Sequence, residues 1–254
     1  AFPCVALLGV RQCGKTTLLH TLPKGWKHFD LERRADQTVI ARDPDAFLRL
    51  NPRRVTLDEA QLVPDIFPAL RVAIDDHRAE KGRFVITGSS SPALTGAIAE
   101  SLAGRVGIIE LAPFSWAEVT QTLRRDSFVK RLLHRTAKPA ALIDGLRPRG
   151  TEADLQDFWF RGGFPEPWLH RAHAFRDRWV EQYIQTYLLR DVKQLFPGLN
   201  DIRFRRFLEL LGGLSGRVLN YADVARALDV SQPTARDYFE IEEPAQREAP
   251  RVKF

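Results

Sequence analysis

The chain has 254 residues, of which 44% are hydrophobic and 28% are charged, a balance typical of a soluble globular protein. No apolar stretch approaches the roughly 20 residues that a membrane-spanning helix needs, and the first ten residues lack the basic lead of a secretory signal. Two cysteines exclude a disulfide framework, and no CxxC or HExxH spacing indicates a metal site. We therefore expect a cytoplasmic protein without a membrane partner.

The net charge of +6 is unevenly distributed along the chain. Residues 121–150 contain 8 basic and 2 acidic residues, so this segment alone carries an excess of +6. Such a segment is either an electrostatic contact for nucleic acid or a solvated, arginine-rich connector. Charge alone leaves both interpretations open.

The first 120 residues alternate short apolar runs with helical patterns, which predicts an α/β fold with a parallel sheet flanked by helices. Several of the runs are continuously apolar, as expected when both faces of a sheet are covered. The expected strands are Cys4–Leu8, Lys27–Leu31, Val55–Leu57, Phe84–Thr87 and Gly107–Leu111, and the expected helices include Thr16–Leu22, Pro64–Asp76 and Pro92–Gly104.

The segment Gly9–Thr16, GVRQCGKT, fits the Walker A pattern G-x-x-x-x-G-K-[ST] and stands between a predicted strand and a predicted helix. Its glycines let backbone N–H groups turn toward an anion, and the helix N-terminus adds a partial positive charge. Lys15 is expected to reach the β- and γ-phosphates, and the Thr16 hydroxyl to complete the shell of Mg²⁺. The sequence thus predicts binding of ATP or ADP with Mg²⁺, through Gly9, Arg11, Gln12, Cys13, Gly14, Lys15, Thr16 and Thr17.

Cys13 has two interpretations. A small side chain is needed to fill space within a tight loop, and cysteine is small. A helix N-terminus also favours the thiolate form, so a reactive, oxidation-sensitive thiol is the alternative.

A second motif, VTLDEAQ, ends a short apolar strand in Asp58 and Glu59. This is the expected Walker B partner of a phosphate-binding loop. Asp58 is expected to bind Mg²⁺, mostly through its water shell, and Glu59 to polarise the attacking water. Adjacent carboxylates favour hydrolysis over transfer to a small acceptor.

The segment FVITGSSS ends another strand in a cluster of hydroxyl side chains. In sheets of this kind the strand between the Walker A and Walker B strands places a polar group near the γ-phosphate or the attacking water. Ser89 is the first candidate for this role and Thr87 the second. A serine that caps the following helix, which has Pro92 in its first turn, is the structural alternative.

The sequence after Pro113 is mainly helical, and we divide the chain into an ATPase domain (1–120), a basic connector with a helical, lid-like region (121–198) and a winged-helix unit (199–254) with an incomplete C-terminus. In the last unit, two short helices joined by a tight turn indicate a helix-turn-helix, with Ser231 as N-cap of the second. Side chains early in that helix are placed to reach DNA base edges, although winged helices in multidomain ATPases often contact protein instead. The candidate DNA contacts are Gln232, Thr234 and Arg236.

Seven segments follow one another in an order that resembles a known family: GVRQCGKTT, VTLDEAQ, FVITGSSS, SLAGR, LAPFSWAEV, GGFPE and YLLRDV. The chain resembles a widespread group of bacterial and archaeal AAA+-like P-loop ATPases. Members of this group join a P-loop ATPase domain to a helical region, a winged-helix unit and a further C-terminal domain of unknown function. The resemblance covers nearly the whole chain and is weakest at its end.

The resemblance implies a role for Arg105. In AAA+ ATPases an arginine at the end of the helix before the last sheet strand is often donated to the nucleotide of a neighbouring subunit, and Arg105 stands at this place. A homo-oligomer with Arg105 acting in trans is implied, and an ordinary surface arginine or an in-chain salt bridge is the alternative. A second phosphate sensor is also usual in such proteins, and both Arg161 and Arg190 are candidates.

These observations predict a Mg²⁺-dependent ATPase of AAA+ type, in which ATP binding and hydrolysis are coupled to action on DNA. The alternative is a nucleotide-gated signalling switch whose winged helix contacts protein. A small-molecule kinase is less compatible with the sequence, because the Asp-Glu pair and the distal helix-turn-helix suit hydrolysis and macromolecular contact better than an acceptor pocket.

Overall fold

The computed structural model of the chain describes residues 1–89, 92–121, 132–133, 150–170, 172–186, 198–214 and 216–246, with the backbone alone at 92–93 and 240–246. The chain divides into two compact units, one formed by Pro113–Arg176 and the other by the residues on either side of that segment. None of the helices described is both long and apolar enough to cross a membrane.

In the described part of the chain, five parallel strands form one sheet in the order β2-β3-β4-β1-β5. The predicted parallel sheet is confirmed, and each strand boundary lies within one residue of its expected place. The strand that precedes the hydroxyl cluster, β4, lies between the strands of the two phosphate-site motifs, as expected. The strands are β1 (Cys4–Leu8), β2 (Lys27–Asp30), β3 (Val55–Asp58), β4 (Phe84–Gly88) and β5 (Val106–Glu110).

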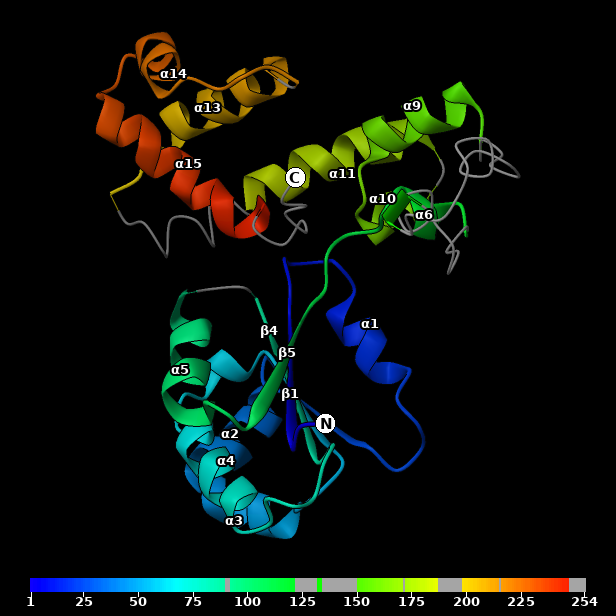
Figure 1. Ribbon diagram of the computed structural model, residues 1–254, viewed down its shortest axis with the longest axis vertical. Coiled ribbons are helices and arrows are strands. Elements are labelled where there is room, and N and C mark those ends of the chain that lie inside the picture. The colour runs from blue at the N-terminus through cyan, green and yellow to red at the C-terminus, as the bar shows by residue number, and fades with distance from the viewer. Residues whose placement is uncertain are drawn as a thin grey trace. The chain divides into compact units, whose positions relative to one another are not determined.

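Helices cover the sheet unequally. Figure 1 shows α1 on one side of the sheet and the helices α2 to α5 on the other. The main core lies on the side with several helices, where Leu57, Phe67 and Phe84 are almost completely buried. The helices are α1 (Lys15–His20), α2 (Arg34–Arg42), α3 (Pro44–Leu50), α4 (Ile66–Asp75) and α5 (Pro92–Leu102), with a 3₁₀ turn η1 at Ala60–Leu62.

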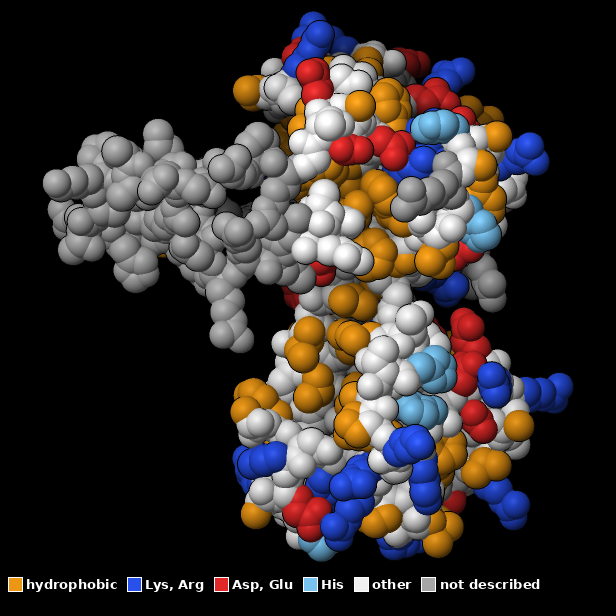
Figure 2. Space-filling view, turned by 90° about the vertical axis from the view of Figure 1, so that its right-hand side faces the viewer, with side chains coloured by type: hydrophobic (Ala, Val, Ile, Leu, Met, Phe, Trp, Pro, Cys, Tyr) orange, Lys and Arg blue, Asp and Glu red, His pale blue; other side chains and the backbone are white. Residues whose placement is uncertain are grey.

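The expectation that several apolar strands are covered on both faces is confirmed for β1, β3 and β4, whereas β5 is largely exposed. Nearly every residue of β1, β3 and β4 is buried, whereas Ile108 and Ile109 of β5 are 51% and 53% exposed. Consecutive side chains of a strand point to opposite faces, so both faces of this edge strand are incompletely covered. Figure 2 views the side of the sheet that α1 covers, and hydrophobic side chains reach the surface there.

The unit formed by Pro113–Arg176 is helical where it is described. The first two of its described helices begin with capping boxes, in which Ser115 pairs with Glu118 and Thr151 with Asp154. Most of the basic segment 121–150 and all of residues 187–197 lie outside the described residues, so the charge prediction made for the connector is not tested. The helices are α6 (Trp116–Val119), α9 (Glu152–Arg161), α10 (Pro165–Leu169) and the beginning of α11 (His173–Thr186).

The C-terminal helices are α13 (Asp201–Gly213), α14 (Tyr221–Leu228) and α15 (Gln232–Gln246). A second core joins them, with Phe204, Phe207 and Tyr238 buried. Asp229 turns the chain after α14 with a left-handed backbone (φ 52°), and Ser231 Oγ accepts from Thr234 N at 3.2 Å. The two predicted helices and the predicted cap are therefore present. No strand follows α15 within the described residues, which end at 246, so the wing stays a prediction.

Candidate functional site

The phosphate loop runs from Gly9, directly after β1, to Lys15, the first residue of α1. A Cβ on Gly9 would lie 2.3 Å from the backbone oxygen of Leu111, so only glycine allows this close approach. Gln12 and Gly14 have left-handed backbones, with φ of 62° and 102°. Gly14 is the N-cap of α1 and offers no side-chain cap, so the first N–H groups of the helix are placed for an anion.

Lys15 is folded across the loop. Its side chain is only 5% exposed, and its ammonium donates to the carbonyl oxygens of Gly9, at 2.9 Å, and Val10, at 3.1 Å. The positive charge therefore lies at the concave side of the loop. Phosphate oxygens bound there would compete with these two carbonyls for the same donors.

The remaining loop residues differ in exposure. Gln12 and Thr17 are exposed, Arg11 is half-buried, and Cys13 is buried. The Cys13 sulfur lies 2.9 Å from the place that a Cβ on Gly9 would take, so its thiol fills the inside of the loop. This packing agrees with the interpretation of Cys13 as a small filler.

The two predicted magnesium ligands are in direct contact. Thr16 Oγ1 donates to Asp58 Oδ2 at 2.6 Å, and the Asp58 side chain is 6% exposed. Thr87, from the neighbouring strand β4, donates its hydroxyl to the other carboxylate oxygen of Asp58. Carboxylate and hydroxyl oxygens are the ligands that Mg²⁺ prefers, so the residues present fit this ion.

Glu59 lies next to this contact and is held at two points. Its backbone is left-handed (φ 56°), and its N–H donates to Thr87 Oγ1 at 3.2 Å. Its carboxylate accepts from Gln61 Nε2 at 2.5 Å. The fully buried hydroxyl of Thr87 thus joins the predicted magnesium ligand Asp58 to the backbone of the predicted general base.

The hydroxyl that contacts the two carboxylate residues is that of Thr87, the second candidate from the sequence. Ser89, the first candidate, directly follows β4 at the same edge of the sheet and is half-buried. Its role at a γ-phosphate stays a prediction. Ser90 and Ser91 lie outside the described residues, so the serine cap of α5 is not tested.

Gln61 also belongs to this site, although the sequence predicts no role for it. It stands in the quoted motif VTLDEAQ, but no general rule links a glutamine two residues after a glutamate to catalysis. Only the 3₁₀ turn at Ala60–Leu62 folds its amide back onto the Glu59 carboxylate.

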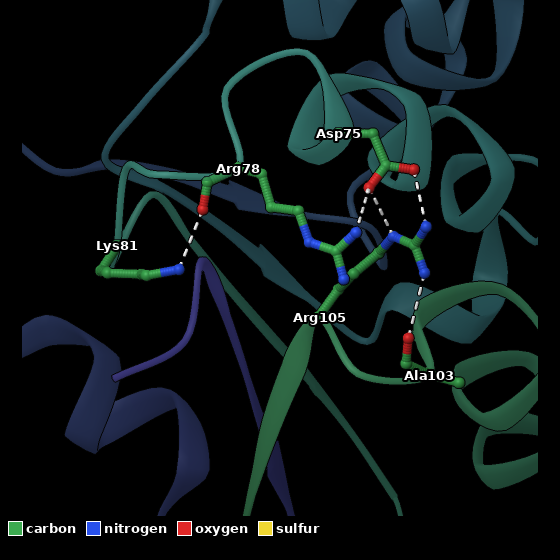
Figure 3. A network of polar contacts seen from close by, with 5 residues as sticks. All are labelled: Asp75, Arg78, Lys81, Ala103 and Arg105. Atoms are coloured by element: carbon green, nitrogen blue, oxygen red, sulfur yellow. Dashed lines mark hydrogen bonds and ion pairs between the residues drawn. The ribbon is translucent and has the colours of Figure 1, made fainter.

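Arg105 forms an ion pair within its own chain (Figure 3). Its Nε and Nη2 donate to the two carboxylate oxygens of Asp75, at 2.8 and 2.7 Å, and its Nη1 donates to Ala103 O at 3.0 Å. These hydrogen bonds hold the pKa of Asp75 below its usual value, and Asp75 in turn raises the pKa of Arg105. The in-chain salt bridge, one of the two alternatives from the sequence, is therefore observed.

Arg105 is also far from the phosphate loop of its own chain. It precedes Val106, which pairs with Cys4 at the start of β1, whereas the loop follows Leu8 at the end of β1. Four steps along a strand separate these two edges by roughly 13 Å. A catalytic role for Arg105 would thus have to be at the nucleotide of another subunit, which stays a prediction.

Arg161, a candidate second phosphate sensor, is buried in its own helical unit with 6% exposure. Its Nε donates to Asp157 at 2.6 Å and its Nη1 to Pro167 O at 2.9 Å. These contacts tie α9 to α10, which is a structural role. Arg190, the other candidate, lies outside the described residues.

The three candidate DNA contacts occupy the first two turns of α15. Gln232 and Arg236 are exposed, whereas Thr234 is half-buried. The Thr234 hydroxyl lies 2.8 Å from Ser231 Oγ, within the cap of the helix. Gln232 and Arg236 are therefore the better placed of the three to contact a partner.

Two family descriptions match the sequence. Residues 1–120 match the sequence model of an AAA domain, and residues 152–244 match that of a domain of unknown function (DUF8612). The uncharacterized proteins Rv2008c of Mycobacterium tuberculosis and Mb2031c of Mycobacterium bovis are each 36% identical to this chain over 241 residues. That alignment covers 94% of this chain and 47% of each relative, so the chain spans about half the length of the curated relatives it matches.

Among solved structures, the RuvB Holliday junction branch migration motor of Thermotoga maritima is similar to 96% of this chain over 80% of its own length, with 18% identity and a TM-score of 0.40. A likeness of this size carries no argument about function.

Proposed function

We propose, from the match of residues 1–120 to the sequence model of an AAA domain, that this protein hydrolyses ATP to ADP and phosphate with Mg²⁺ as cofactor. The observation that supports this most directly is the hydrogen-bonded series from Thr16 to Asp58, from Asp58 to Thr87 and from Thr87 to the N–H of Glu59. It brings the expected metal ligands and the expected general base to the end of the phosphate loop.

Each residue has one part in the proposed reaction. Lys15 and the N–H groups of the loop would bind the phosphates, and Thr16 and Asp58 would hold Mg²⁺, which would supply positive charge to the phosphate oxygens. Glu59 orients a water and accepts its proton as the water oxygen attacks the γ-phosphorus. The bond from this phosphorus to the β,γ-bridging oxygen breaks, and ADP leaves.

The test of this proposal is a pair of variants. Lys15→Ala is expected to lose nucleotide binding, because it removes the charge from the concave side of the loop. Glu59→Gln is expected to bind ATP with wild-type affinity and to hydrolyse it about 10²- to 10⁴-fold more slowly, the range that general-base catalysis contributes. Titration with a fluorescent ATP analogue and steady-state phosphate release measure the two effects. Wild-type turnover of Glu59→Gln would show that Glu59 is not the base.

We also propose that the beginning of α15 contacts DNA and couples it to the ATP cycle. The support is the exposure of Gln232 and Arg236 after a capped helix start, together with three exposed arginines on α13, which are Arg203, Arg205 and Arg206. Cationic side chains on neighbouring helices attract the phosphate backbone and release its condensed counterions. This contribution weakens as the salt concentration rises, because the release of counterions then gains less entropy.

DNA binding is tested by measuring ATPase activity and DNA affinity at several salt concentrations. DNA is expected to stimulate turnover, and Arg236→Ala to weaken the affinity and lower its salt dependence. Arg226→Ala is the matched control, because Arg226 is an exposed arginine on α14, outside the beginning of α15. Turnover that DNA leaves unchanged, with tightly retained ADP, would instead support a nucleotide-gated switch whose C-terminal helices contact protein.

Finally, we propose that the active form is a homo-oligomer in which Arg105 reaches the nucleotide of a neighbouring subunit. The support is the place of Arg105 at the edge of the sheet opposite its own phosphate loop. Arg105 pairs with Asp75 of its own chain, so to reach the nucleotide of a neighbour it would have to leave the Asp75 carboxylate and pair with a phosphate.

A further inference from the structure

We propose that Gln61 is the positioning residue of the general base, holding the Glu59 carboxylate toward the attacking water. The inference rests on the proposed role of Glu59. Its geometric basis is the 2.5 Å hydrogen bond from Gln61 Nε2 to Glu59 Oε2. Among the described residues the Gln61 amide makes no other polar contact, so we expect it to act on the reaction through Glu59.

Gln61 is itself fixed from two directions. The 3₁₀ turn that carries it is closed by a hydrogen bond from Val63 N to Ala60 O, and Ala60 is completely buried. The end of the Gln61 side chain lies against Gly88, where an added Cβ would be 2.3 Å from Gln61 Oε1. The glutamine amide therefore occupies the space that the missing side chain of Gly88 leaves at the end of β4.

Packing alone does not explain why the side chain at position 61 is an amide, whereas the contact with Glu59 does. Gln61 Oε1 is buried and has no hydrogen-bond partner among the described residues. A buried acceptor without a partner is unfavourable, and an apolar side chain of the same size would fill the space beside Gly88 without this cost. The one polar contact that the amide makes in the described part of the chain is its donation to Glu59.

Both the backbone and the carboxylate of Glu59 are thus held by contacts that depend on β4. Thr87 holds its backbone N–H, and Gln61, seated on Gly88, holds its carboxylate. A glutamate side chain has several rotatable bonds, and the position of a catalytic group to within about 1 Å can change the rate about 10²-fold. The consequence is that Gln61 should affect the catalytic step and leave nucleotide binding unchanged.

The test is Gln61→Leu in the full chain, with steady-state ATP hydrolysis and titration of a fluorescent ATP analogue. We expect kcat to fall about ten- to hundredfold, with KM and the Kd for nucleotide within about twofold of wild type. Gln61→Glu keeps the shape of the side chain and places a second carboxylate beside Glu59, so we expect it to lower kcat at least as much. It provides the same test if Gln61→Leu fails to fold.

Gln37→Leu is the matched control. Gln37 donates its Nε2 to Leu62 O at 3.4 Å, so this variant makes the same chemical change beside the same 3₁₀ turn without touching Glu59. Its kcat is expected to stay within about twofold of wild type, as for a surface position outside the site. An equal loss of kcat in Gln37→Leu would mean that disturbing the turn, and not losing the Glu59 contact, is responsible.

A double variant separates positioning from a structural role. Because Gln61 acts through Glu59, Gln61→Leu combined with Glu59→Gln should hydrolyse ATP in single turnover no more slowly than Glu59→Gln alone. A further loss in the double variant, or wild-type kcat in Gln61→Leu, overturns the proposal. Wild-type turnover in Glu59→Gln would be a different failure, that of the base assignment itself.

Discussion

At the residue scale, the phosphate loop depends on an absent side chain. The backbone at Gly9 passes so close to Leu111 that a Cβ there would lie 2.3 Å from a carbonyl oxygen. A backbone atom cannot move aside as the end of a flexible side chain can, so the loop would have to shift.

Asp75 and Arg105 are also single residues with a large local effect, because these two charged side chains, far apart in the sequence, form an ion pair.

Gly9→Ala is expected to weaken ATP binding at least about tenfold and to lower the melting temperature, because the displaced loop no longer presents its N–H groups in one direction. Gly96→Ala is the control. Gly96 is in α5 with nothing within 4 Å of an added Cβ, so alanine there should stabilise the protein by about 0.5–1 kcal/mol. A nucleotide titration and a thermal melt of both variants decide the matter, and wild-type affinity in Gly9→Ala would contradict the prediction.

The Asp75–Arg105 pair should stabilise the protein in a pH-dependent way. Hydrogen bonds from Arg105 hold the pKa of Asp75 below its usual value of 3.8. A carboxyl group with a lowered pKa stabilises the folded state above its unfolded pKa, and this contribution is lost as the pH falls through the folded value. Asp75→Asn should therefore melt at a lower temperature than wild type at pH 7, with a difference that begins to shrink near pH 3.8 and disappears as the pH falls through the lower folded pKa of Asp75. A difference that stays constant down to pH 3 would rule this out.

At the scale of the element, caps made from local sequence define the C-terminal helices. Asn200 and Asn220 accept from the N–H groups of Arg203 and Ala222, and Ser231 accepts from Thr234. Each cap satisfies an N–H group that has no partner within its helix. The placing of α14 and α15, and hence of Gln232 and Arg236, depends on these short-range contacts.

Asn220→Ala should destabilise α14 by about 1 kcal/mol, which corresponds to about fivefold faster amide exchange in this helix. Asn220→Asp should exchange at the wild-type rate, because aspartate caps a helix as well as asparagine does. Hydrogen exchange followed by mass spectrometry of peptides from 216–230 measures both. Equal protection in the alanine and aspartate variants would show that the cap contributes nothing to α14.

At the scale of the whole molecule, the phosphate-loop residues and the candidate arginine finger lie at opposite edges of the sheet. Gly9–Thr16, Asp58 and Glu59 all lie at the carboxyl edge of the sheet, whereas Arg105 lies at the amino edge. A closed ring of identical subunits brings two different surfaces of neighbouring copies together at each interface. Such an assembly allows Arg105 of one copy to meet the phosphate loop of the next.

Mixing two inactive variants tests this assembly. Arg105→Ala lacks the arginine but keeps the loop, and Lys15→Ala lacks the loop lysine but keeps the arginine, so each alone should be inactive. In a 1:1 mixture of freely exchanging subunits, roughly a quarter of the interfaces would combine an intact loop with an intact arginine, and ATPase activity should reappear. Wild-type turnover of Arg105→Ala alone would exclude the trans role, and a mixture without activity would argue against it.

The sequence by itself determined those features that depend on neighbours along the chain. The alternation of apolar runs and helical patterns predicted each strand of the described residues to within one residue, and the glycines and lysine of GVRQCGKT predicted the loop. The cap at Ser231 followed from a hydroxyl placed three residues before the N–H it accepts from. Such features could be read from the sequence because backbone conformation and hydrogen bonding within a turn depend mainly on adjacent residues.

The partners of the functional side chains were decided only by the tertiary structure. Strand order and register, and not sequence proximity, brought Thr87, the second hydroxyl candidate from the sequence, to Asp58 and Glu59. Residues 30 positions apart formed the Asp75–Arg105 pair, and Ile108 and Ile109 of the edge strand β5 are exposed although they are as apolar as the buried residues of β1. The physical reason is the same in each case: a side chain pairs with whatever the packed elements bring within hydrogen-bonding distance, and that depends on contacts between segments distant in the chain.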